Sequence, residues 1–158
     1  MNTDLFQRIV KLNRHYRNIQ GNPCLPNFED FKDYSVNFED EIEELQEALD
    51  KEDFDGVRDA LCDLVVYVFG GFYKLGVDAN DDINTVVDSL YSRFIKNEQD
   101  LQDSLDYYYC KGIKDVSVEG EFPMKVIRSM QNYPDAPKGK VLKSVHYKQP
   151  KLTKYESD

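Results

Sequence analysis

Apolar residues recur at helical spacing through the first two thirds of the chain. Their three- and four-residue periodicity predicts helices over about residues 3–17, 36–50, 57–75 and 82–105. From Leu64 onward the third helix is apolar nearly all round, so we expect it to be central or to lie in a subunit interface. Four amphipathic helices joined by short turns are typical of a helix bundle.

The pattern changes after residue 106. The stretch DVSVEGEFPMKVIRS alternates apolar and polar residues around a Gly turn, which predicts a small β excursion, and KVLKSVHYKQPKLTKYESD reads as an extended basic tail. We therefore predict an all-α, four-helix-bundle-like fold with a small C-terminal β or extended excursion. Its helical domain is expected over 1–106, and the excursion and tail, 107–158, are expected to belong to the same domain.

Two adjacent glycines interrupt the third predicted helix. Gly70 and Gly71 each cost about 1 kcal/mol in a helix interior relative to Ala. Such a cost suggests a place where another backbone must come close to the helix. We therefore predict tight packing of a neighbouring helix at these two positions.

Composition narrows the possible functions. A chain of 158 residues is the size of one ordinary domain, and its 30 acidic against 20 basic residues give a net charge of −10. This balance disfavours a binder of duplex nucleic acid, because such proteins neutralise phosphates with Lys and Arg. A polyanionic substrate would need compensating divalent cations.

Cysteine usage and hydropathy bear on location. Cys24, Cys62 and Cys110 fit neither a disulfide framework nor a zinc site, which favours reduced thiols in a cytoplasm. The chain has no run near the roughly 18 apolar residues that span a membrane, and its start does not resemble a signal peptide. We expect a cytoplasmic protein without a membrane partner.

Carboxylates gather on two predicted helices that flank one short turn, within EDEIEELQEALDKEDFDGVRDALCD. Projection on an ideal helix places Glu41 and Glu44 beside the apolar stripe of the first, and Asp59 and Asp63 on one strip of the second. That strip becomes apolar further on, where an unpaired acid is costly. Convergent carboxylates are the usual ligands of Mg²⁺ and Mn²⁺. An ordinary acidic helix surface remains the alternative.

Four ordered signatures resemble one known family. The run from Asp40 through Glu41-x-x-Glu44, followed by Asp59-Ala-Leu-Cys-Asp63, resembles the EExxE and ExxD metal-binding motifs of MazG-like nucleoside triphosphate pyrophosphohydrolases. This superfamily also includes phosphoribosyl-ATP pyrophosphohydrolase-like proteins. SLYSRF at 89–94 resembles its SNxSKF signature, and GKVLKSVHYKQP at 139–150 resembles the GKVLK-x-x-x-Y-x-x-P tail of the phage-borne branch.

The sequence departs from these motifs at several positions. Asp40 replaces the first Glu, Ala60 stands where ExxD has its Glu, Leu90 replaces the Asn, and Arg93 replaces the Lys with its charge retained. Asp59, or a water molecule, would then supply the missing ligand. A second register pairs Glu44 with Glu47, so either Asp59 or Glu47 could complete the metal site. Glu47, or else Glu43, could also orient the attacking water.

The resemblance implies a MazG-type fold and a reaction. A (deoxy)nucleoside triphosphate would be hydrolysed to the monophosphate and pyrophosphate. The reaction would use Mg²⁺, or Mn²⁺ in its place, and the ion would be held by Glu41, Glu44, Asp59 and Asp63. Glu44, which serves in both registers, would also be catalytic. Arg93 and Lys96 would contact phosphate oxygens, and the base would lie in an apolar pocket walled by the first three helices.

The family's habits imply a homodimer or homotetramer, in agreement with the apolar third helix. The alternative function is a helical oligomeric nucleotide-binding or scaffold protein with weakened catalysis, and it is motivated by Ala60 and Leu90.

Overall fold

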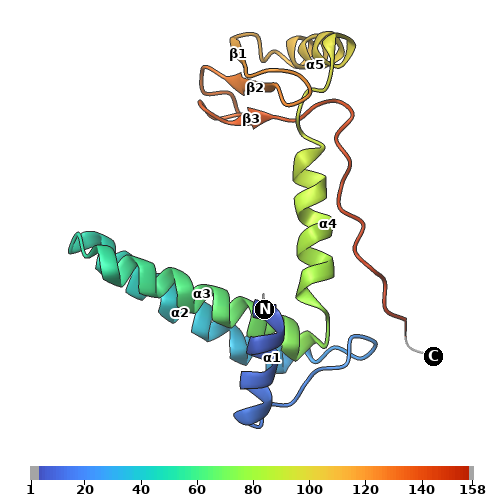
Figure 1. Ribbon diagram of the computed structural model, residues 1–158. Helices are drawn as coiled ribbons and strands as arrows, with labels where there is room; N and C mark the ends of the chain where they lie inside the picture. The colour runs from blue at the N-terminus through green and yellow to red at the C-terminus, as the bar shows by residue number, and fades with distance from the viewer. Residues whose placement is uncertain (1–3, 157–158) are drawn as a thin grey trace. The chain divides into compact units, whose positions relative to one another are not determined.

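The computed structural model describes residues 4–156 (Figure 1). The chain forms two compact units, each described here by itself: an N-terminal unit that runs to Asp82 and takes in the segment from Thr153, and a C-terminal unit, Ile83–Leu152. The elements in chain order are α1 (Leu5–His15), α2 (Phe28–Asp50), α3 (Phe54–Leu75), α4 (Ala79–Tyr91), α5 (Glu98–Cys110), β1 (Val116–Glu119), β2 (Val126–Ser129) and β3 (Val141–Leu142).

The N-terminal unit is built on an antiparallel pair of long helices. α2 and α3 lie side by side, and α1 packs against α3 (Figure 1). Short side-chain caps fix where the pair begins: the Asn27 side chain accepts from the Asp30 amide, and that of Asp53 accepts from the Gly56 amide. Gly76, with φ of 74°, ends α3 in the left-handed conformation that favours Gly.

The glycine pair is tightly packed, but the groups that approach it are side chains and not the backbone that the sequence led us to expect. A Cβ atom at Gly70 would overlap the Tyr34 hydroxyl, and one at Gly71 would lie 3.4 Å from the Phe31 ring. The Tyr34 hydroxyl donates to the Tyr67 carbonyl at 2.7 Å. Both aromatic side chains come from the first two turns of α2, which the prediction had left out by starting this helix at residue 36.

The C-terminal unit combines α5 with a three-stranded antiparallel sheet in the order β1-β2-β3. Its core consists of five buried residues, with Leu101, Leu105 and Tyr108 of α5 packed against it: Ile95, Ile113, Ile127, Ala136 and Leu142. The alternating stretch that predicted a β excursion forms β1 and β2.

The predicted single helix over 82–105 is wrong, because the chain leaves helical conformation after Tyr91. Ile95 instead exchanges backbone hydrogen bonds with Lys125, at 2.9 and 3.2 Å. Asn97 then caps α5 by accepting from the Asp100 amide at 2.9 Å. Burial of Ile95 against the sheet therefore competes successfully with the helical periodicity around it.

The predicted all-α, four-helix-bundle-like fold is also wrong. The described residues form five helices and a three-stranded sheet, and the protein is largely helical without being a pure bundle. Tertiary pairing of the Ile95 segment with the sheet divides the fourth predicted helix in two and gives the C-terminal unit a core of its own.

The length and hydropathy of the helices bear on whether any of them could span a membrane. Within 4–156 no single helix is long and apolar enough to cross a membrane, and only α3 and α4 taken together satisfy such a test by length and composition.

Candidate metal centre

A buried carboxylate stands at the middle of the candidate centre. Glu41 on α2 is only 7% exposed, and its Oε2 atom is buried without a hydrogen-bond partner among the described residues. A buried charged oxygen left unsatisfied costs about 1–3 kcal/mol or more. Burial raises the pKa of the Glu41 carboxyl, and the negative charge of Glu44 is the next largest cause.

Five carboxylates from α2 and α3 form what we call the acidic cluster: Asp40, Glu41, Glu44, Asp59 and Asp63. The charges that raise the pKa of Glu41 are, in decreasing order, those of Glu44, Asp63, Asp40 and Asp59. None of the five makes an ion pair with a Lys, Arg or His in the described part of the chain. Their mutual repulsion is therefore uncompensated by protein groups.

The acidic cluster is an electrostatic grouping and not a finished coordination sphere. Over residues 4–156 no three His, Cys, Asp or Glu side chains are arranged so that they could hold a metal ion together. Glu44 and Asp59 are exposed, whereas Asp63 is half-buried. Because exposed side chains change rotamer within picoseconds to nanoseconds, the two exposed acids are free to turn toward a bound cation.

A cavity of about 250 Å³ in the N-terminal unit is lined by both Glu41 and Asp63. Its other walls come from α1, from the segment just after α1, and from α2 and α3. These lining residues are Leu12, Asn13, Tyr16, Asn18, Tyr34, Val66 and Tyr67. The cavity is smaller than the roughly 300–1,000 Å³ of pockets that enclose a drug-sized ligand. It would therefore enclose only part of such a ligand.

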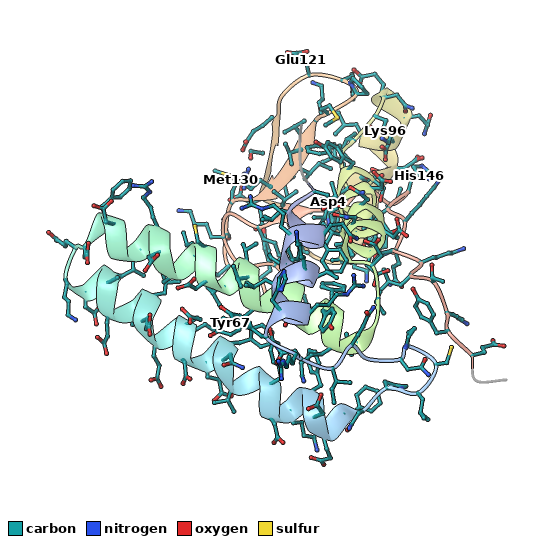
Figure 2. The ribbon with its side chains drawn as sticks, turned by 60° about the horizontal axis from the view of Figure 1, so that its bottom comes forward. Asp4, Tyr67, Lys96, Glu121, Met130 and His146 are labelled. Carbon is teal, nitrogen blue, oxygen red and sulfur yellow. The ribbon has the colours of Figure 1, made fainter. Side chains whose placement is uncertain are left out.

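Aromatic side chains make one wall of this cavity. The Tyr34 and Tyr67 rings lie 6.2 Å apart at 61°, and Figure 2 labels Tyr67 on the side of α3 that faces α2. Burial, followed by the Glu41 charge, raises the pKa of Tyr67, and burial together with Tyr67 raises the pKa of Tyr34 to about 12. Both phenols are therefore neutral near pH 7.

The opposite wall carries two amides. Asn18 Nδ2 donates to Asn13 Oδ1 at 2.9 Å, and Asn13 Nδ2 donates to the Ile9 carbonyl at 2.9 Å. The cavity is thus more polar than the apolar pocket expected from the sequence. Sequence reasoning missed Asn13 and Tyr34, although helical spacing from Ile9 to Asn13 was a usable signal for the first.

The residues that separate the two registers differ in their surroundings. The Glu47 carboxylate accepts from Lys51 Nζ at 3.2 Å on the surface, and Glu47 and Glu43 are absent from the charges that raise the pKa of Glu41. Ala60, at the position of the expected Glu, is buried at 3% exposure, while Asp59 beside it is exposed. The choice of Asp59 as fourth ligand stays a prediction.

The two residues expected to contact phosphate lie in the C-terminal unit. Lys96 is exposed, and its backbone N–H donates to Asp100 at 2.9 Å (Figure 2). Arg93 is half-buried, its Nε has no partner within the described residues, and its guanidinium carbon lies 5.6 Å from the centre of the Tyr147 ring. The signatures at 89–94 and 139–150 thus meet within one unit.

The comparisons with known proteins leave the family open. No protein-family model matches the sequence, and no curated protein is significantly similar to it. The resemblance therefore rests on the quoted motif residues alone.

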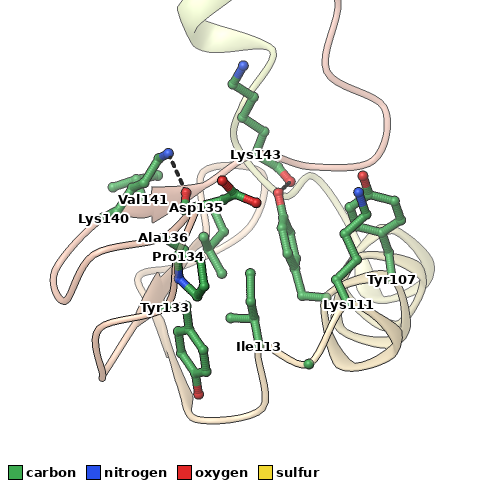
Figure 3. Close-up of a pocket in the computed structure, with 13 residues that line it drawn as sticks. Tyr107, Lys111, Ile113, Tyr133, Pro134, Asp135, Ala136, Lys140, Val141 and Lys143 are labelled. Atoms are coloured by element: carbon green, nitrogen blue, oxygen red, sulfur yellow. Dashed lines mark hydrogen bonds between the residues drawn. The ribbon is translucent and has the colours of Figure 1, made fainter.

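A second cavity, of about 480 Å³, lies in the C-terminal unit between the end of α5, residues 133–136 and β3 (Figure 3). Its tyrosines are held by backbone contacts: the Tyr108 hydroxyl donates to the Lys143 carbonyl at 2.8 Å, and that of Tyr133 accepts from the Asp115 amide at 2.9 Å. The Lys143 side chain points away from this cavity (Figure 3).

Proposed function

We propose that the protein hydrolyses a (deoxy)nucleoside triphosphate to the monophosphate and pyrophosphate in the presence of Mg²⁺. The observation that carries the proposal is Glu41, a buried carboxylate with an unsatisfied oxygen whose pKa is raised by the charges of four further carboxylates on the same helix pair. A divalent cation would satisfy that oxygen and offset the repulsion.

The donor atoms suit such an ion, but no three acids within residues 4–156 are already arranged to hold it, so the exposed Glu44 and Asp59 would have to turn toward it. Glu41, Glu44, Asp63 and Asp59 would hold Mg²⁺ or Mn²⁺, which when bound would lower the pKa of a water and neutralise phosphate charge. All four are oxygen donors, and no protein cation competes for them among the described residues. These donors match the preference of hard cations.

The chain's own groups supply binding and orientation. The cavity beside Glu41 and Asp63 would take the base, with the neutral rings of Tyr34 and Tyr67 as stacking surfaces. Glu44 is exposed next to Glu41, where it would accept a proton from the attacking water. Arg93 and Lys96 keep their expected role as phosphate contacts.

The direct test is the identity of the products. With Mg²⁺ present, each common NTP and dNTP is incubated with the protein, and pyrophosphate, phosphate and nucleotide products are separated by chromatography. We expect monophosphate and pyrophosphate in equal amounts, with activity removed by EDTA and restored by Mg²⁺ or Mn²⁺. Release of diphosphate and phosphate, or no turnover of any of the nucleotides, would contradict the proposal.

The second candidate is a nucleotide-binding or scaffold protein with weak catalysis. It is favoured by the exposed positions of Glu44 and Asp59, by the absence of a preformed metal group within the described residues, and by the replacements Ala60 and Leu90. This candidate predicts saturable nucleotide binding without pyrophosphate release. Calorimetry with the same nucleotides separates it from the hydrolase.

Self-association is part of the proposed function. Leu61, Val65 and Val68 lie on one face of α3 and are exposed, and Ile42 and Leu49 are exposed on α2. Apolar surface repeated at this helical spacing is typical of a subunit interface. We expect a homodimer or homotetramer at micromolar concentration by sedimentation velocity, in place of an 18.5 kDa species.

A charged substitution tests this interface. Val65→Asp should shift the protein toward monomer, while Val86→Asp, an exposed apolar position on α4, should leave its mass unchanged. A wild-type protein that sediments as a monomer would refute the prediction.

The three unpaired, exposed cysteines support the cytoplasmic location proposed with this function.

A further inference from the structure

Two cations converge on one aromatic ring in the C-terminal unit. The guanidinium carbon of Arg93 lies 5.6 Å from the centre of the Tyr147 ring, and Lys143 Nζ lies 4.3 Å from the same centre. Arg93 follows α4, whereas Lys143 and Tyr147 follow β3. Two positive groups separated in sequence by 50 residues therefore share one neighbour.

Hydrogen bonds fix these segments against each other. The Lys148 carbonyl accepts from Ser89 Oγ at 2.8 Å, and the Lys148 amide donates to Ser92 Oγ at 2.9 Å. Further along, Ser144 Oγ donates to the buried carboxylate of Asp100 at 2.6 Å. The Arg93 carbonyl accepts from the Ser144 amide at 3.0 Å. The arrangement around Tyr147 is thus preorganised by protein contacts.

The two cations have no acidic partner. Neither Arg93 nor Lys143 lies within 4.0 Å of a carboxylate oxygen in the part of the chain that the structure describes. Arg93 Nε, a buried donor, also lacks an acceptor. A buried donor without a partner is unfavourable, and an incoming acceptor would remove that cost.

The surrounding charge favours an anion. The C-terminal unit carries eleven Lys and Arg against nine Asp and Glu, in a chain whose net charge is −10. Hydrogen bonding to Ser89 lowers the pKa of the Tyr147 phenol, and the positive charges of Lys143 and Arg93 act in the same direction. The same field that favours phenolate also favours an external oxyanion.

We propose that Arg93, Lys143 and Tyr147 form a binding site for a phosphate group. Two cations in contact with one ring match the double charge of a phosphate better than the single charge of a carboxylate, and an Arg fork binds phosphate oxygens through parallel N–H donors. The Tyr147 ring positions both cations, and its hydroxyl offers a further polar contact. This site rests on the role of Arg93 as a phosphate contact in the proposed function and adds Lys143 and Tyr147 to it. All three residues lie in the C-terminal unit, so phosphate binding can be measured without metal or turnover.

The test is a titration of the full chain, labelled with ¹⁵N, with inorganic pyrophosphate in EDTA, followed by amide NMR shifts. We expect saturable shifts at 89–96 and 143–148. Lys143→Met and Arg93→Gln should each weaken binding about tenfold, as expected for a lost charge-assisted contact. Arg93→Lys, which keeps the charge but removes Nε, should weaken it less.

The matched control is Lys138→Gln, since Lys138 is exposed and its side chain makes no ion pair within residues 4–156. Circular dichroism shows whether each variant is folded. If Arg93→Gln does not fold, Lys143→Met carries the test. Shifts spread over all lysines, or equal weakening by Lys138→Gln, would overturn the site. A parallel titration with a nucleoside monophosphate tells whether free or nucleotide-borne phosphate is preferred, and saturation by either supports the site.

Failure of this site and failure of the hydrolase are distinguishable. Pyrophosphate binding in EDTA without any NTP turnover would support the phosphate site and refute the proposed function. Turnover that needs Glu41 but is unaffected by Lys143→Met, with no shifts at 143–148, would do the reverse.

Discussion

Asp63→Asn is expected to lower the rate of pyrophosphate release on the order of 10³-fold, or about 4 kcal/mol in the barrier. The substitution keeps the size of the side chain but removes one of the two charges that act most strongly on Glu41. Asp63 also lines the cavity that would take the base, so its loss affects the point where metal and substrate would meet. Steady-state rates under saturating Mg²⁺ measure the effect.

A short series around Asp63 supplies the controls. Asp59→Asn should cost less, because the charge of Asp59 has the smallest effect on Glu41 among the four neighbours. Asp50→Asn should be silent, since Asp50 is exposed and only accepts from Gln46 at 3.0 Å. An Asp63→Asn variant that turns over normally would place the chemistry elsewhere.

Glu41→Gln is expected to abolish Mg²⁺ stabilisation while making the metal-free protein more stable at neutral pH. In the wild type, the Glu41 carboxylate is destabilised by its burial and by repulsion from Glu44 and Asp63. The neutral amide lowers the cost of burial and removes the repulsion. The gain should be about 1–3 kcal/mol in the free energy of unfolding. Thermal unfolding in EDTA and in Mg²⁺, followed by circular dichroism, measures both effects.

The pH dependence gives this prediction a sign. Because the pKa of Glu41 is raised above its ordinary value of 4.5 in the folded protein, the folded state holds the proton more tightly than the unfolded state does. The contribution of Glu41 to stability is therefore full below pH 4.5 and is lost as pH rises through the folded pKa. Glu41→Gln should remove that loss.

The matched control for the pH profile is Glu43→Gln, an exposed acid on the same helix that is absent from the charges acting on Glu41. It should leave both the profile and the Mg²⁺ effect unchanged. A metal-free Glu41→Gln protein less stable than the wild type at pH 7 would show that another group satisfies the Glu41 carboxylate.

The sequence was most informative where local periodicity and burial agree. The span of α3, the close approach at Gly70 and the grouping of acids on two neighbouring helices all depend on which residues share a helix face. That property can be read from spacing alone. The identity of Glu41 as the buried acid is less direct, because it requires the depth of packing between α2 and α3.

Spacing failed where distant segments decide the conformation. Ile95 has helical neighbours but pairs with Lys125, and the first turns of α2 are helical because Phe31 and Tyr34 pack on the glycine pair. Both outcomes depend on contacts between residues 30 or more positions apart. The cavity wall at Tyr34 and the convergence of Arg93 and Lys143 on Tyr147 were missed for the same reason.

Asp100 joins α5 to the segment after β3 through two serine side chains, so the residues of this network are expected to be inherited together. Its Oδ1 accepts from Ser104 at 3.2 Å and from Ser144 at 2.6 Å, and Ser104 Oγ in turn accepts from the Val145 amide at 3.1 Å. A substitution at position 100, 104 or 144 would leave a buried polar group at one of the other positions without its hydrogen-bond partner. Positions 100, 104 and 144 should therefore covary among descendants of this gene, and the tail from 143 should be lost or kept together with α5.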